Sequence, residues 1–198
     1  MIKHFYVFRH GQTENNLRKI WQGARFNPFL NVTGVQEAKD LSEKLFPLGL
    51  EVIYTSDLRR AKQTAQIVSE KCQIPVIIDG ALLEIDFGEA EGKPYDELYK
   101  LYPEITPAVL HITPETWDKR FPGVKSESKH EAFIRIRNDL LKISQECKSS
   151  IIGISTHGGI MSALLVGLGS PETYVHNCGV AHITYDTQTD SLSFVEMV

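Results

Sequence analysis

Short apolar segments rich in β-forming residues alternate along this chain with segments whose apolar residues recur every three or four positions. The first kind comprises residues 3–8, 52–54, 75–78 and 151–155, and the second comprises residues 13–19, 34–45, 58–72, 133–143 and 158–168. Such alternation predicts an α/β fold: a three-layer sandwich in which helices flank a mostly parallel sheet. Residues 180–185 and 191–197 surround a polar turn and predict a closing hairpin.

The predicted helices carry their own start and stop signals. We expect Thr13 and Thr33 to cap the first two helices, and Ser56 or Asp57 to cap the third, because Ser, Thr and Asp side chains accept hydrogen bonds from the free N–H groups of a first turn. Gly49 is expected to close the second helix.

Residues 86–127 interrupt the alternation. They hold Pro94, Pro103, Pro107, Pro114 and Pro122, five of the nine prolines of the chain. Because proline breaks helices, helical pieces here must be short. We expect a small helical insertion, acting as a lid or a substrate-selecting wall, within a single domain that spans residues 1–198.

Charge and cysteine content exclude several classes of protein. The net charge of −4 offers no basic excess for nucleic acid or an anionic membrane. The three cysteines are widely spaced and do not suggest disulfides, which favours a cytoplasmic protein. No apolar run approaches the ~20 residues of a membrane span, and the first residues are too short for a signal peptide.

Four predicted strand ends carry residues suited to chemistry. Arg9-His10-Gly11 and Thr156-His157-Gly158 follow two strands, Arg59-Arg60 follows a third, and Glu84 follows a fourth. Ligands of open α/β sheets bind beyond the carboxyl ends of the strands, so these groups are expected to converge.

This set of residue types suits phosphoryl transfer. Arginine offers a bidentate fork to phosphate, a neutral imidazole can act as nucleophile, and a carboxyl group can protonate a leaving oxygen and then activate water. The ordinary pKa of histidine, about 6.5, already leaves much of the imidazole neutral near neutral pH, and nearby arginines lower it further.

Several stretches also resemble the motifs of one family, in family order. Residues 9–16 resemble R-H-G-[EQ]-T-x-x-N, residues 30–34 L-[TN]-x-x-G, residues 56–65 S-x-L-x-R-A-x-x-T-A, residues 82–92 L-x-E-x-D-F-G-x-x-E-G, and residues 156–159 the second-histidine motif. The chain thus resembles the histidine phosphatase superfamily, also called phosphoglycerate mutase-like, and within it the phosphatase branch.

The resemblance implies a role for each matching position. His10 would be the phosphorylated nucleophile and Glu84 the general acid and base. The phosphate clamp would comprise Arg9, Arg60 and His157, with Asn16 adding its amide and Gly11 and Gly158 allowing close approach of the backbone.

For some of these residues an ordinary structural role is the alternative to a functional one. Arg59 or Arg60 could each be a solvated helix residue; the family pattern selects Arg60, and selects Glu84 with Asp86 second. Gln22 and Gly23 are expected to border the pocket, although the neighbouring Trp21 could equally be a packing residue.

One departure concerns the G-G-E-[ST] element that many relatives carry before the long helix. The stretch matched to it is 121–126, where Lys125 stands in place of the acid. Lys125 is then either a solvated charge or an added binder for an anionic substrate.

The function we expect is hydrolysis of a small phosphomonoester through a phosphohistidine, as in an α-ribazole phosphatase-like or broad-specificity enzyme. Cofactor-dependent phosphoglycerate mutase is the alternative, and a non-catalytic phospholigand binder a further one. We expect no metal and no cofactor, because arginines and histidines supply the charge. The expected partner is a small phosphorylated metabolite rather than nucleic acid or membrane, and a homodimer stays open.

Overall fold

The computed structural model describes residues 1–113 and 115–198, so that Pro114 lies outside the described part. Its centre is one six-stranded sheet in the order β3-β2-β4-β1-β5-β6. The strands are β1 (Ile2–Arg9), β2 (Val52–Thr55), β3 (Val76–Ile78), β4 (Ile151–Thr156), β5 (Val180–Asp186) and β6 (Ser191–Met197). Strands β1 to β4 pair in parallel, and β5 and β6 add the predicted antiparallel hairpin.

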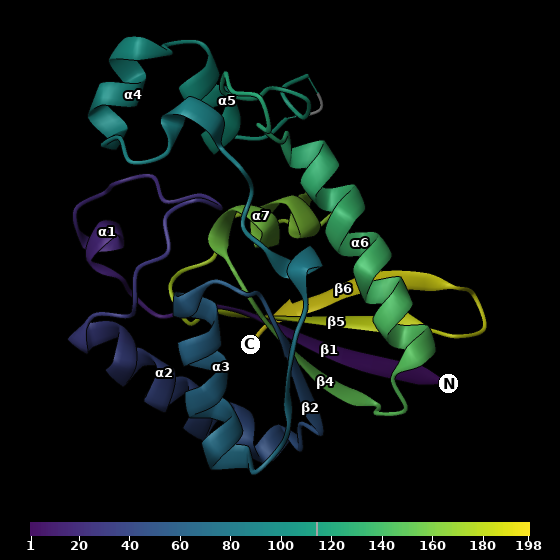
Figure 1. The fold of residues 1–198 in the computed structure, drawn as a ribbon. Coiled ribbons are helices and arrows are strands. Elements are labelled where there is room, and N and C mark those ends of the chain that lie inside the picture. Colours follow the sequence, from purple (N-terminus) through teal and green to yellow (C-terminus); the bar gives the residue numbers. More distant parts are fainter. Residues whose placement is uncertain (114) are drawn as a thin grey trace.

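Helices cover both faces of this sheet, which confirms the three-layer prediction (Figure 1). One face packs against α2 (Val32–Leu45) and α3 (Arg59–Cys72), and the other against α6 (Lys129–Glu146) and α7 (Gly158–Gly167). The alternation along β1 explains the layers: Phe5 and Val7 join the α6/α7 core, whereas Phe8 joins the α2/α3 core. Burying such a side chain stabilises the fold by about 1.5–3 kcal/mol.

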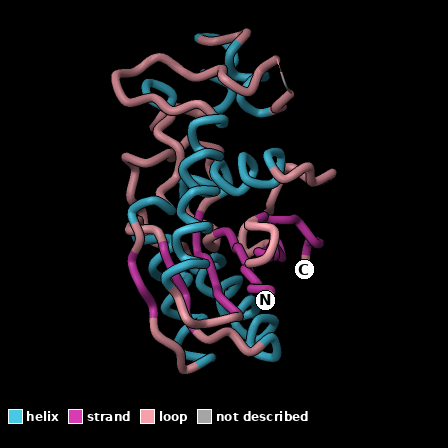
Figure 2. The backbone as a smooth tube through the Cα atoms, turned by 90° about the vertical axis from the view of Figure 1, so that its right-hand side faces the viewer, coloured by secondary structure: helices cyan, strands magenta, loops and turns pink. Residues whose placement is uncertain are grey.

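The segment 86–127 forms its own group at one end of the molecule, and the strands lie toward the other end (Figures 1 and 2). Its helices are short, as its prolines predict: η3 (Gly88–Ala90), α4 (Tyr95–Leu101) and α5 (Ile105–Leu110). It has a separate core that includes Phe87, Leu98 and Phe121 and that also reaches Trp21 and the α6/α7 pair. This end therefore forms a wall that is packed onto the sheet domain.

The helix starts agree only partly with expectation. Thr13 caps α1 (Glu14–Leu17) as predicted. Helix α2 starts earlier, because Asn31 and not Thr33 accepts the hydrogen bond from Gly34 N–H, at 2.8 Å. The N-cap of α3 is Leu58, without a side-chain cap. Ser56 instead binds a histidine of the site described below.

The remaining short elements continue the α/β alternation. Helix α2 passes into η1 (Phe46–Leu48), which ends at Gly49 in the left-handed conformation, φ 72°, as predicted. Strand β3 is followed by η2 (Gly80–Leu82), and Glu84 comes two residues after η2. In the described part of the chain, no helix combines the length and the apolar character needed to cross a membrane.

Candidate active site

Two histidines leave the sheet side by side. Strands β1 and β4 are parallel neighbours with Arg9 opposite Thr156, so His10 and His157 emerge at the same edge. Their ring centroids lie 5.2 Å apart. Both rings are buried, with exposures of 2% and 0%. The sheet register, set by residues nearly 150 positions apart, thus forms the centre of the site.

A backbone carbonyl determines which nitrogen of His10 is free. The carbonyl oxygen of Gly11 can only accept, so Nδ1 of His10, at 2.7 Å, donates its proton there. Burial, together with the charges of Arg60 and Arg9, lowers the pKa of His10 well below the ordinary 6.5. The ring is therefore neutral at neutral pH, with an unprotonated Nε2. The Nε atom of Arg60 lies 3.2 Å from that nitrogen.

Arg60 is held in the first turn of α3 by the loop before α2. Its guanidinium donates to the carbonyl oxygens of Phe26 at 2.6 Å and Gly23 at 2.8 Å. Burial lowers its pKa to about 10, which still leaves it charged at neutral pH. Arg59, the competing residue, is exposed and lies over the ring of Phe29.

Two buried nitrogen atoms at this edge lack a hydrogen-bond partner among the described residues. They are Nε of Arg9 and Nδ1 of His157. Nη1 of Arg9 donates to the carbonyl of Val175 at 2.8 Å, and Nε2 of His157 pairs with the Ser56 hydroxyl at 2.7 Å. An unsatisfied buried polar group costs about 1–3 kcal/mol, so such atoms indicate a place where a ligand completes the bonding.

The carboxylate of Glu84 lies at the N-terminus of α7. It accepts hydrogen bonds from the backbone N–H groups of Gly159, at 2.9 Å, and Ile160, at 3.0 Å. Its own neighbour Ile85 donates a third, at 2.9 Å. These three donors at the positive end of the helix dipole hold the carboxylate in place.

The other acids near Glu84 are occupied elsewhere. Asp86 forms an ion pair with Arg25 at 2.9 Å. Glu91 accepts the backbone N–H groups of Ala24 and Arg25, and that of Phe87. They brace the loop that holds Arg60, and neither carboxylate lines the pocket.

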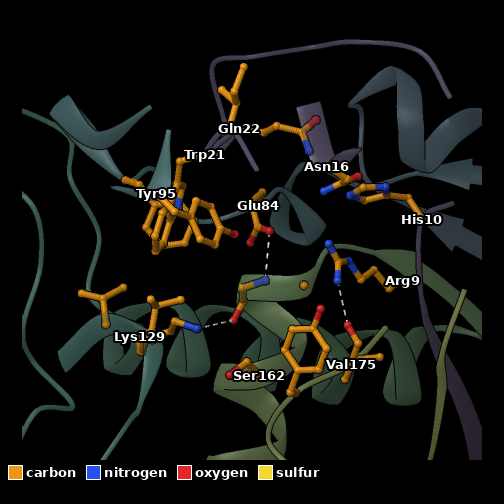
Figure 3. A pocket seen from close by; sticks show the side chains of 18 of the residues that line it. Arg9, His10, Asn16, Trp21, Gln22, Glu84, Tyr95, Lys129, Ser162 and Val175 are labelled. Atoms are coloured by element: carbon orange, nitrogen blue, oxygen red, sulfur yellow. Dashed lines mark hydrogen bonds between the residues drawn. The ribbon is translucent and has the colours of Figure 1, made fainter. Parts of the chain in front are cut away.

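These side chains surround a cavity of about 420 Å³ (Figure 3). The predicted residues that line it are Arg9, His10, Asn16, Gln22, Gly23, Arg60, Glu84 and Gly158. Because Oδ1 of Asn16 and Oε1 of Gln22 accept from Thr13, their amide nitrogens are left for the cavity. The arrangement can bind a phosphate between two arginines, with an imidazole nitrogen on one side and a carboxyl group nearby.

The comparisons with known proteins agree with this geometry. The model of the histidine phosphatase superfamily (branch 1) matches residues 5–196. This chain belongs to the histidine phosphatase superfamily. It is therefore an enzyme, and its site is that of a histidine phosphatase-type protein.

Named relatives include both phosphatases and mutases. The chain is 33% identical to the "Uncharacterized phosphatase PhoE" of Bacillus subtilis (strain 168) over 168 residues, which cover 84% of this chain and 78% of the relative. It is 29% identical to the "Probable phosphoglycerate mutase GpmB" of Enterobacter sp. (strain 638) over 186 residues, 91% of this chain and 84% of the relative. A crystal structure of phosphoglycerate mutase from Bacillus anthracis str. Sterne matches with a TM-score of 0.85 and 27% identity, covering 100% and 92% of the two chains.

Two predicted residues of this histidine phosphatase do not line the cavity. His157 is buried directly beside His10. Gly11 was expected to let the backbone approach phosphate, but its N–H donates to the Thr64 hydroxyl at 3.1 Å. A Cβ at position 11 would lie 2.4 Å from the carbonyl oxygen of Gly34. Glycine is thus required there for packing against the start of α2.

Lys125 is not the added binder of the pocket. It is exposed and lies outside the cavity lining. The acid that directly precedes α6 is Glu127, which pairs with Arg135 at 2.6 Å, and Ser128 caps the helix.

The cation that sequence reasoning missed is Lys129, the first residue of α6. It lines the cavity and is 7% exposed. Burial lowers its pKa to about 8, and Glu84 acts in the opposite direction. A lysine in the first turn of an amphipathic helix is normally predicted to face solvent. The sequence pattern therefore does not indicate that this lysine enters the cavity.

Proposed function

We propose that this histidine phosphatase hydrolyses a small phosphomonoester without a metal ion, through a phosphohistidine at Nε2 of His10. The observation that carries the proposal is the hydrogen bond from Nδ1 of His10 to the Gly11 carbonyl. It leaves Nε2 unprotonated beside Arg60, at the edge of the cavity. A neutral imidazole nitrogen among cations is suited to attack phosphorus.

In the first step Nε2 attacks phosphorus, an N–P bond forms and the ester P–O bond breaks. Glu84 enters this step as the carboxylic acid and gives its proton to the departing oxygen. Arg9 and Arg60 stabilise the charge on the transferring oxygens, and so does Nδ1–H of His157 when the Ser56 hydroxyl donates to Nε2 of that ring.

In the second step water attacks phosphorus and the N–P bond breaks. Glu84, now a carboxylate, takes a proton from that water as it attacks. The products are inorganic phosphate and the starting form of His10. Positioned arginines supply the charge stabilisation, so no step requires a metal ion.

Phosphoglycerate mutase activity is the second candidate, favoured by the similarity to the GpmB protein and to the B. anthracis structure. The chemistry differs only in the acceptor, which would be a hydroxyl group of a sugar acid instead of water. Incubation with 3-phosphoglycerate distinguishes the two. Release of inorganic phosphate supports the phosphatase, and formation of 2-phosphoglycerate supports the mutase.

The first test is hydrolysis of 4-nitrophenyl phosphate with EDTA present. We expect turnover by the wild type and loss to background in His10→Ala, because no other group replaces the nucleophile. His130→Ala is the matched control, since that histidine pairs with Asp118 and lies against Trp117, outside the cavity lining, and should keep full activity. Denaturation of the working enzyme at alkaline pH should trap wild-type protein that carries one phosphoryl group, because the N–P bond of a phosphohistidine is stable in base and labile in acid.

Two outcomes contradict the proposal. Turnover abolished by EDTA would remove the metal-independent mechanism. Turnover that persists in His10→Ala would remove the phosphohistidine.

A further inference from the structure

Lys129 is a buried cation with little to bind. Its ammonium donates to the carbonyl of Gly159 at 3.3 Å, and in the described residues it has no ion-pair partner within 4.0 Å. An ammonium has three donors, so two remain for a ligand. The cost of removing this charge from water is therefore not offset by the protein alone.

Once a phosphate dianion is bound, the cavity holds one more positive charge than negative charges, and that charge is the ammonium of Lys129. Arg9 and Arg60 match the two negative charges of a phosphate dianion. Glu84 must be protonated to act as an acid, so it is then neutral and no longer balances a nearby cation. One positive charge remains uncompensated, on Lys129.

That charge lies on the leaving-group side of the cavity. In Figure 3, Lys129 is on the opposite side of Glu84 from Arg9 and His10, and it lines the same cavity. The wall between is aromatic: the ring of Trp21 lies 4.8 Å from that of Tyr95 and 5.0 Å from that of Phe87, centroid to centroid. A flat or apolar body can therefore occupy the space between the phosphate site and Lys129.

We propose that Lys129 is a specificity-determining residue that binds an acidic group of the leaving group. The preferred substrates are then phosphomonoesters whose leaving group carries a carboxylate or a second phosphate on an apolar or ring-sized body. This inference rests on the proposed function, since it concerns the substrate class of the same site.

A different role for Lys129 would be support of Glu84. The lysine binds the carbonyl of Gly159 while Glu84 binds the N–H of the same residue, so the two groups share one anchor. Such support would affect every substrate alike and would appear in kcat. Binding of an acidic group would affect only acidic substrates and would appear mainly in KM.

The experiment compares matched aryl phosphates. Phenyl phosphate has a neutral leaving group, 3- and 4-carboxyphenyl phosphate add a carboxylate, and 1,4-phenylene bisphosphate adds a second phosphate. Each is assayed with the wild type, Lys129→Met and Lys129→Arg. Lys125→Met is the control, because that lysine is exposed and outside the cavity.

We expect the wild type to prefer at least one acidic substrate over phenyl phosphate. Lys129→Met should lower kcat/KM for that substrate by about tenfold to a hundredfold, through KM, as expected for loss of a charged hydrogen bond. The loss on phenyl phosphate should be clearly smaller, and the Tm of Lys129→Met, compared with that of the wild type, shows whether the variant is folded. Lys129→Arg should recover part of the preference, and Lys125→Met should change nothing.

The preferred acidic substrate, carboxylate or bisphosphate, identifies the acidic group. A wild type without preference for either would overturn the inference, as would an equal loss on neutral and acidic substrates in Lys129→Met. Failure of the wild type to hydrolyse any of the four esters would instead contradict the proposed function.

Discussion

At the scale of single residues, hydrogen bonds to the backbone decide the chemical state of the site. The carbonyl of Gly11 selects the tautomer of His10, and those of Gly23 and Phe26 aim the guanidinium of Arg60. Each of these carbonyls belongs to a loop, and each loop is in turn held by buried contacts. The site is therefore preorganised before any substrate enters.

Arg60 allows a direct test of this view. The guanidinium of Arg60 binds two carbonyl oxygens and at the same time directs Nε toward His10, and a lysine ammonium cannot make all these contacts. Arg60→Lys should therefore lower kcat/KM by about a hundredfold or more. The measurement is steady-state hydrolysis of 4-nitrophenyl phosphate. Arg59→Lys, one residue away and exposed, should retain nearly full activity. Full activity of Arg60→Lys would mean that the charge alone, and not its geometry, matters.

At the scale of elements, α6 and the start of α7 together hold the carboxyl group. Arg135 of α6 donates to the carbonyl oxygens of Ala81 at 2.6 Å and Leu83 at 2.9 Å, directly before Glu84. Its pairing with Glu127 keeps the guanidinium in place. The first turn of α7 then binds Glu84 itself. Two helices on the same face of the sheet thus position one side chain.

The start of α2 provides a prediction at this scale. Asn31→Ala removes the cap that accepts Gly34 N–H, and also the amide that donates to Gln12 at 2.9 Å. We expect a loss of about 1 kcal/mol in the free energy of unfolding, measured by urea denaturation. Thr33→Ala, at the exposed position that the sequence pattern favoured, should change it by less than about 0.5 kcal/mol. The reverse order would show that the cap assignment is wrong.

At the scale of the whole molecule, the segment after β3 lies against α6, so that residues far apart in the chain share one buried junction. Asp139 of α6 and Asp79 of that loop form a close pair of carboxyl groups. Burial, together with the charge of Asp79, raises the pKa of Asp139 to about 6. Oδ2 of Asp139 is buried without a partner among the described residues. The junction therefore opposes ionisation of Asp139.

This pair predicts a pH-dependent stability. The pKa of Asp139 is higher in the folded than in the unfolded chain, so the folded state binds the extra proton between about pH 4 and 6. Stability from this group is present at low pH and is lost as the pH rises through 6. Asp139→Asn mimics the protonated form, so its Tm should exceed that of the wild type by about 2–4 °C at pH 8.

At pH 5 the difference between Asp139→Asn and the wild type should be smaller, since wild-type Asp139 is then largely protonated in the folded state. Differential scanning calorimetry at both pH values measures the effect. Asp40→Asn, at an exposed position of α2, is the control and should show no such dependence. An equal Tm change at pH 5 and pH 8 would contradict the argument.

Local patterns were enough to predict most of the elements, the layers and most of the polar residues that line the cavity. Helical and strand periodicities depend on near neighbours, and the carboxyl ends of parallel strands meet at one edge wherever the strands pair. His10, His157, Arg60 and Glu84 each follow such a strand, so their convergence follows from the alternation. The motifs of the histidine phosphatase superfamily selected Arg60 over its neighbour.

Contacts between distant segments decided the rest. Ser56 binds a histidine about 100 positions away, Gly11 is required by the backbone of Gly34, and Lys129 enters the pocket only because α6 starts beside α7. None of these partners is visible in the spacing around the residue itself. A side chain at a helix start can face solvent, a cap or a cavity, and only the packing of the other elements decides which of them it meets.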